Sequence, residues 1–171
     1  GYRQRMDGSA GVWILGGYQS DFARNLTKEG HDFAALTAEV VDATLSSAKI
    51  NPADVGVVHV ANAFGEVFAG QAHLGAMPAT VCDGLWDTPA TRHEAACASG
   101  SVAALAALAD LRSGGYDSAL VIGIELEKTI PGDTAAQHLG AAAGPSPTPS
   151  RTTTRPTRSP RAGCDALTAA K

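Results

Sequence analysis

One cysteine stands in a setting that suits a nucleophile. Cys97 lies in the stretch His93-Glu94-Ala95-Ala96-Cys97-Ala98-Ser99-Gly100-Ser101, between a short predicted strand and an alanine-rich predicted helix. Free N–H groups in the first turn of a helix favour an anion, so this position favours the thiolate, the reactive form of cysteine. Ala98, Ser99 and Gly100 are small enough to admit a bulky acyl group. An acyl-accepting cysteine is one prediction, and a small hydrophobic core residue is the other reading of such a site.

Three further polar residues are candidates for a role near this cysteine. His93 and Glu94 precede it by four and three positions, and they either tune Cys97 or serve the structure. Because side chains alternate along a strand, at least one of the two is expected to point away and to be structural. His138 either lines the mouth of an active site or lies in a solvated loop, and we favour the loop.

The sequence does not favour a metal ion or a nucleic acid as a ligand. His31, His59 and His73 have no metal-ligand spacing with one another or with the cysteines, so no metal site is predicted. Four arginines between 151 and 161 lack interleaved aromatic residues, so nucleic acid is not expected as a partner.

The elements that must position Cys97 follow from the apolar pattern. Their order is a strand over 12–17, a helix between Asp32 and Asn51, a strand over 55–60, a short helix with loops over 65–80, a strand over 91–96, a helix over 99–112 and a strand over 119–124. Strands that are apolar without alternation are covered on both faces. The helix over 99–112 is apolar on nearly all sides and is therefore expected to be buried on nearly all sides. The pattern predicts a layered α/β fold with a mostly parallel sheet covered by helices.

Bulk properties divide the chain into three parts. Residues 1–143 carry 8 Lys/Arg and 16 Asp/Glu, or −8, whereas residues 144–171 carry 5 Lys/Arg and 1 Asp, or +4. We expect a disordered N-terminus over 1–10, a domain over 11–143, and a disordered or frame-shifted tail rich in Pro, Arg, Ser and Thr over 144–171. No membrane span or signal segment is visible. Three cysteines do not make a disulfide framework, so a cytoplasmic location is expected.

Several segments, in order, resemble one enzyme family. Ala96-Cys97-Ala98-Ser99-Gly100 resembles the nucleophile motif of thiolases, and Val121-Ile122-Gly123-Ile124-Glu125 resembles the strand that follows it. Asp21-Phe22-Ala23-Arg24 and Gly70–Gly75 resemble earlier family segments. The nearest subgroup is the acetyl-CoA acetyltransferases similar to sterol-carrier-protein-type thiolases, and the resemblance covers the N-terminal half only.

The resemblance implies a function as well as a thiolase-like fold. Thiolases transfer acyl groups between CoA thioesters through a cysteine acyl-enzyme, and Cys97 would be that cysteine. Acetyl-CoA and CoA would be substrates, with no bound cofactor and no metal. The family also implies a homodimer, with neither a membrane nor a nucleic acid as partner.

The remaining catalytic groups of the family are not found in this sequence. The family activates its nucleophile with the His of a Gly-His-Pro motif, and no Gly-His-Pro occurs here. Cys164, followed by Asp165-Ala166, does not fit the family's second cysteine. We therefore expect an incomplete N-terminal half, truncated or frame-shifted and inactive as it stands. The alternatives are a ketoacyl-synthase-like condensing enzyme that uses acyl carrier protein, and a non-catalytic fragment.

Overall fold

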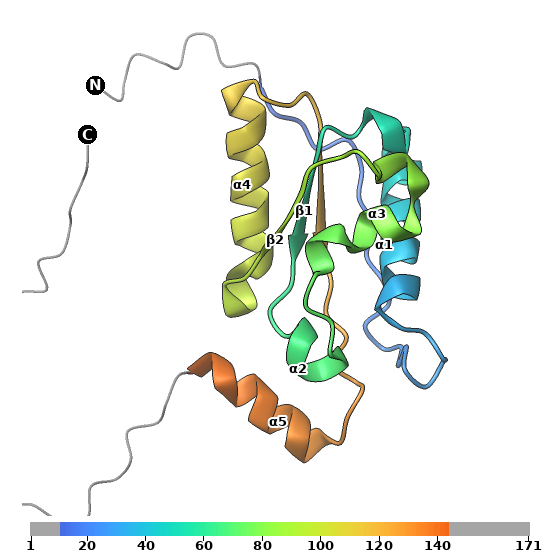
Figure 1. Ribbon diagram of the computed structural model, residues 1–171, viewed down its shortest axis with the longest axis vertical. Helices are drawn as coiled ribbons and strands as arrows, with labels where there is room; N and C mark the ends of the chain where they lie inside the picture. The colour runs from blue at the N-terminus through green and yellow to red at the C-terminus, as the bar shows by residue number, and fades with distance from the viewer. Residues whose placement is uncertain (1–10, 144–171) are drawn as a thin grey trace, which may run out of the picture.

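Three parallel strands form the centre of the computed structural model, which describes residues 11–143 (Figure 1). β1 (Val57–Ala61) lies between β2 (Ala90–His93) and β3 (Ala119–Gly123), and all five of its residues are buried. In the register, Ala61 is paired with His93 on one side and with Gly123 on the other, so the three strands end together. The predictions for 1–10 and 144–171 concern residues outside the described part.

Helices cover both faces of this sheet. α1 (Phe33–Ala48) and α3 (Met77–Val81) lie on one face and α4 (Ser99–Ser113) lies on the other (Figure 1). The aliphatic core lies on the α1 side, and its members include Phe33, Leu36, Val41, Leu45, Val58, Val60, Leu120 and Ile122. The layered α/β fold with a parallel sheet is therefore confirmed, with strand ends within three residues of the predicted ones.

The ends of α1 follow from local chemistry. Asp32 caps its first turn, because its carboxylate accepts the N–H of Ala35 at 2.9 Å. At the other end Lys49 adopts a left-handed conformation, with φ of 57°, and its N–H bonds the last carbonyls of the helix.

α4 lies on the sheet through alanines. Ala103 and Ala107 are 0% and 4% exposed, and their small side chains let the helix approach the strands closely. The expectation of burial on nearly all sides is wrong, since Leu105 on another side of the helix is 65% exposed. The reason is that one sheet face covers one stripe of α4, and no other described element covers the rest.

The predicted strand over 12–17 is also wrong. Residues 11–20 form no strand, and the side chains of Trp13 and Ile14 are 80% and 97% exposed. Gly16 explains the path of this segment, because a Cβ on it would lie 2.6 Å from the backbone N of Ala48. The segment therefore packs against the end of α1 and has no strand beside it.

Shorter elements complete the described chain. The segment over 65–80 holds α2 (Gly65–Ala69) and the start of α3, as the glycines and proline there predicted. α5 (Gly132–Gly140) was not predicted, because Gly132 and Gly140 and four polar residues leave it few apolar positions. Short 3-10 turns lie at Pro52–Asp54, Leu74–Ala76, Asp83–Leu85, Ala96–Ala98 and Ala141–Ala143. No helix in the described residues is long and apolar enough to cross a membrane.

Candidate active site

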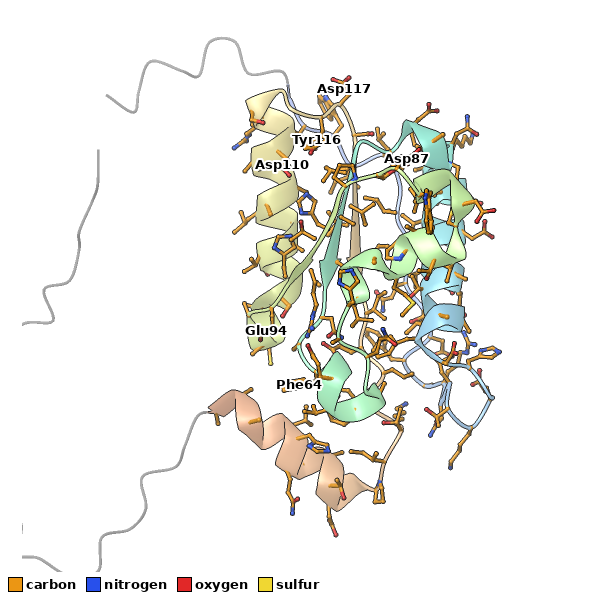
Figure 2. All side chains as sticks on the ribbon, in the orientation of Figure 1. Phe64, Asp87, Glu94, Asp110, Tyr116 and Asp117 are labelled. Carbon is orange, nitrogen blue, oxygen red and sulfur yellow. The ribbon has the colours of Figure 1, made fainter. Side chains whose placement is uncertain are left out.

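Cys97 lies at the carboxyl end of the parallel sheet, in the 3-10 turn that joins β2 to α4. The carboxyl edge is where parallel α/β sheets bind their ligands. Figure 2 shows Glu94 at the lower end of α4 and Phe64 next to it at α2, whereas Asp87 and Asp117 lie at the opposite end. A cleft of about 680 Å³ opens at this edge. Its lining includes Phe22, Phe64, Cys97, Ser99, Glu125 and Leu139.

The backbone before Cys97 is strained. Ala96 has a φ of 48°, in the left-handed region that residues with a Cβ rarely adopt. Such a conformation costs about 1–3 kcal/mol and persists where its surroundings hold it. Two bonds do so here: the Glu94 carboxylate accepts the Ala96 N–H at 2.6 Å, and the Ala95 carbonyl accepts the Ala98 N–H at 2.9 Å.

Ser99 closes the same turn from the first residue of α4. Its hydroxyl accepts the N–H of Ala95 at 2.9 Å and donates to the carbonyl of Ala96 at 2.7 Å. Ser99 is buried, so these bonds are shielded from water. Together they place the Cys97 side chain at a sharp strand-to-helix turn, a placement that acyl-transfer enzymes use for their nucleophile.

Cys97 itself is available for chemistry. It is a free, exposed thiol at the cleft. Among residues 11–143 no hydrogen bond engages its backbone N–H, because the neighbouring amides of Ala95, Ala96 and Ala98 take the local acceptors. That N–H can therefore donate to an oxygen bound beside the sulfur.

His93 and Glu94 are turned to other partners. The His93 ring bonds His59, with 2.9 Å between Nε2 of His93 and Nδ1 of His59, and Glu94 bonds the Ala96 amide. Within the described residues neither side chain forms a hydrogen bond to Cys97. His93 serves the structure, as was favoured, and Glu94 acts on the turn and not on the sulfur.

Comparison with known proteins identifies the family. The family model described as "Thiolase, N-terminal domain" matches residues 12–144. The chain belongs to the thiolase family. An acetyl-CoA acetyltransferase of Methanocaldococcus jannaschii is 36% identical over 125 residues, which are 73% of this chain and 31% of that protein. The chain thus spans about a third of the length of this curated relative.

Two polar residues of this thiolase domain support the cleft and are not among the predicted site residues: Glu125 lines it, and Asn62 bonds Ile124 of its lining. Asn62 follows β1 and is 1% exposed. Its amide donates to the Ile124 carbonyl at 2.7 Å, and its side-chain oxygen accepts the Gly65 N–H at 2.9 Å. Glu125 follows β3 and accepts the N–H of Ala63, and burial raises the pKa of its carboxyl. A polar residue directly after a fully buried strand is the signal that could have found Asn62, whereas Glu125 lies two positions after the partly buried β3.

A charged pair supports the loop after β1. Arg92 of β2 forms a two-pronged ion pair with Glu66 of α2 and also donates to the Ala72 carbonyl at 3.1 Å. The hydrogen bond from Arg92 holds the pKa of the Glu66 carboxyl below its usual value. This pair ties the loop that carries Asn62 to the strand that leads to Cys97.

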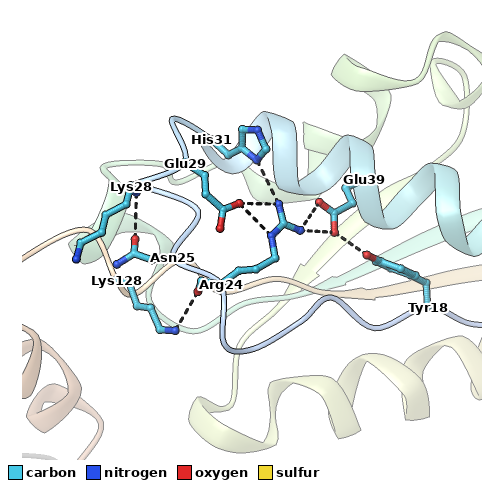
Figure 3. A network of polar contacts seen from close by, with 8 residues as sticks. All are labelled: Tyr18, Arg24, Asn25, Lys28, Glu29, His31, Glu39 and Lys128. Atoms are coloured by element: carbon cyan, nitrogen blue, oxygen red, sulfur yellow. Dashed lines mark hydrogen bonds and ion pairs between the residues drawn. The ribbon is translucent and has the colours of Figure 1, made fainter.

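A polar network fixes the rim of the cleft on the α1 side of the sheet (Figure 3). Arg24 bonds both Glu39 oxygens, at 3.1 and 2.9 Å, and reaches Glu29 at 3.0 Å. The Tyr18 hydroxyl donates to Glu39 at 2.6 Å, and this bond is the main reason that the pKa of the Glu39 carboxyl is lowered. Lys128 donates to the carbonyls of Phe22 and Arg24, both at 2.9 Å, and so holds Phe22 at the cleft.

The other histidines do not form a ligand site in the described residues. His138 lies on α5, not in a loop, and its ring packs edge-on against Phe68 with 5.4 Å between ring centres. Between residues 11 and 143, no group of three or more His, Cys, Asp or Glu side chains is arranged to hold a metal ion.

Proposed function

We propose that this thiolase domain accepts an acyl group from a CoA thioester on Cys97. The observation that carries the proposal is the strained, hydrogen-bonded turn that presents an exposed thiol and an unoccupied N–H at one cleft. The relative from M. jannaschii is named an acetyl-CoA acetyltransferase, which supports acetyl-CoA as the donor.

The proposed step is a thioester exchange. The Cys97 thiolate attacks the thioester carbonyl carbon and forms a C–S bond, and the carbonyl oxygen takes the negative charge. The Cys97 N–H stabilises that oxyanion. The intermediate then expels the CoA thiolate, which takes up a proton from water, and the acyl group stays on Cys97. In the second step a CoA thiolate, or the enolate of a second acetyl-CoA, takes the acyl group from the cysteine.

The proposal extends to the substrates, the assembly and the location of the protein. We infer CoA thioesters of lipid metabolism as substrates and a homodimer as the assembly, both from the family. A cytoplasmic location is proposed because Cys82 and Cys97 are free thiols. We propose that the chain by itself accepts an acyl group slowly and does not turn over, because the Gly-His-Pro histidine that activates the nucleophile in this family does not occur in its sequence.

The test is acetylation of the purified chain by acetyl-CoA, followed by peptide mass spectrometry. We expect one acetyl group on the peptide with Cys97 and none on the peptide with Cys82, which is half-buried and serves as the internal control. Cys97→Ala should abolish the adduct. The proposal is wrong if Cys82 and Cys97 are labelled equally, or if Cys97 reacts no faster than a synthetic peptide of residues 94–100.

A further inference from the structure

The face of the sheet that α4 covers holds a buried pair of histidines that the acyl-transfer step does not use. His59, in the middle of β1, is 3% exposed. Its Nδ1 lies 2.9 Å from Nε2 of His93, and the two ring centres are 5.1 Å apart. On its other side, His59 Nε2 lies 3.3 Å from an Asp110 carboxylate oxygen of α4, too poorly aligned for a hydrogen bond.

These three residues involve both elements that flank the Cys97 turn, β2 and α4. His93 ends the strand before the turn, and Asp110 lies on the helix after it. On α4, Asp110 shares the sheet-facing stripe of Ser99, Ala103 and Ala107, which recur at steps of three or four residues. His59 therefore lies between the end of β2 and α4, where its ring bonds His93 and faces the Asp110 carboxylate.

The contact between the rings depends on the number of protons that they carry. A bond between two imidazole nitrogens needs one donor and one acceptor. The Asp110 carboxylate favours the His59 proton on Nε2, which leaves Nδ1 to accept the N–H of His93. A second proton on His59 breaks this bond once His93 is also fully protonated, because Nδ1 of His59 and Nε2 of His93 are then both donors.

The surroundings keep that second proton off at neutral pH. Burial lowers the pKa of His59, protonation of His93 would lower it further, and Asp110 opposes both. The other elements packed on β1 add no charge here: β3 places Val121 next to His59, α4 adds Ala103 and Ala107, and the turn Leu74–Ala76 has no titratable side chain.

We propose that His59, His93 and Asp110 form a proton-sensitive clamp that positions the Cys97 turn. His59 is a positioning residue, because it acts on the nucleophile through His93 and α4. In the neutral clamp the turn is held with Ala96 in its strained conformation. Acid breaks the ring-to-ring bond and releases the strand end from β1, so the turn loosens. The inference rests on the proposed function only in treating Cys97 as the nucleophile.

Hydrogen exchange of the whole chain tests the clamp. The measured quantity is the protection factor of amides 94–99, which removes the intrinsic pH dependence of exchange, with amides 36–45 of α1 as the reference. Because the pKa of His59 is lowered, the transition lies below the ordinary range of histidine, and we expect protection of 94–99 to fall about tenfold between about pH 6 and about pH 4.5 while α1 stays protected. His59→Gln should show low protection at both pH values, and His73→Gln, at an exposed histidine, should behave as the parent chain.

A second variant keeps the test decisive if His59→Gln does not fold. Asp110→Asn removes the charge that favours a protonated His59, so the loss of protection should move to lower pH. The clamp is disproved by unchanged protection of 94–99 in acid, by a parallel loss in α1, or by a midpoint in Asp110→Asn that stays or rises. Failure of the acetylation experiment would leave these results unaffected, so the two proposals fail separately.

Discussion

Asn62 shows how one side chain can define the shape of this site. It follows the central strand and bonds two backbone segments, at Ile124 in the cleft lining and at Gly65 in α2. Both partners are backbone groups that form no hydrogen bond to a neighbouring strand at that point. A buried amide with all its bonds made is stabilising, and its loss leaves two polar groups buried without partners.

Replacement of Asn62 by Ala should therefore be costly. We expect Asn62→Ala to lower the free energy of unfolding by about 2–4 kcal/mol, because the Ile124 carbonyl and the Gly65 N–H both lose their partner. Urea denaturation followed by circular dichroism measures this change. Asn51→Ala is the matched control, since Asn51 is exposed and its amide has one long bond, 3.4 Å to Asp54. Equal losses in the two variants would contradict the role given to Asn62.

At the scale of elements, α4 connects the Cys97 turn to the packing against the sheet. Its first residue, Ser99, closes the Cys97 turn, and its alanines set the distance to the sheet. The small side chains at Ala103 and Ala107 leave room for His59 between helix and strand. Side-chain size on this stripe therefore controls where the turn lies.

A larger side chain on the sheet-facing stripe of α4 should displace the helix from the sheet. Ala103→Leu places three extra carbons at a position that is 0% exposed, and we expect a loss of about 1–3 kcal/mol in the free energy of unfolding. Ala104→Leu, one residue on and exposed, is the control and should change stability by less than about 0.5 kcal/mol. Urea midpoints of the two variants give the comparison, and a Cys97 acetylation rate lowered in Ala103→Leu alone would link the packing to the turn.

At the scale of the whole molecule, apolar surface is left open. Trp13 and Ile14 stand exposed next to each other, and β2 and β3 each have an edge with no strand beside it in the described residues. Open strand edges and clustered apolar side chains promote association. Both the proposed homodimer and nonspecific association would bury this apolar surface.

Charges placed on this surface should reduce self-association. We expect the double variant Trp13→Lys and Ile14→Lys to weaken association at least about tenfold, because burying two large apolar side chains contributes more than about 1.4 kcal/mol. Sedimentation velocity over a range of concentrations measures it. Trp86→Lys is the control, since Trp86 is 71% exposed elsewhere in the chain. An association that is the same in all three proteins would show that residues 13 and 14 do not take part.

The sequence predicts the strand-to-helix turn at Cys97 and the central layers, because both depend on local pattern. The apolar runs over 55–60 and 119–124 predict strands that the structure has at 57–61 and 119–123. The segment over 12–17 was misjudged, since a strand needs a partner and apolar residues cannot reveal whether one is present. Asn62 and the His59–His93 pair were missed as contacts because they join residues about thirty to sixty positions apart.

The central place of β1 has a consequence for how the chain folds during synthesis. β1 is made first of the three strands, yet its neighbours are completed only at His93 and at Gly123. Pairing across such long connections is slow, because loop closure must precede any gain from the ladder. The apolar residues of β1 therefore have no strand partner until residue 93 has been made, and they lack their second partner until residue 123 has been made. Before Gly123 is made, the wall of the cleft that follows β3 is missing, so Cys97 is synthesised before the cleft that it lines is complete.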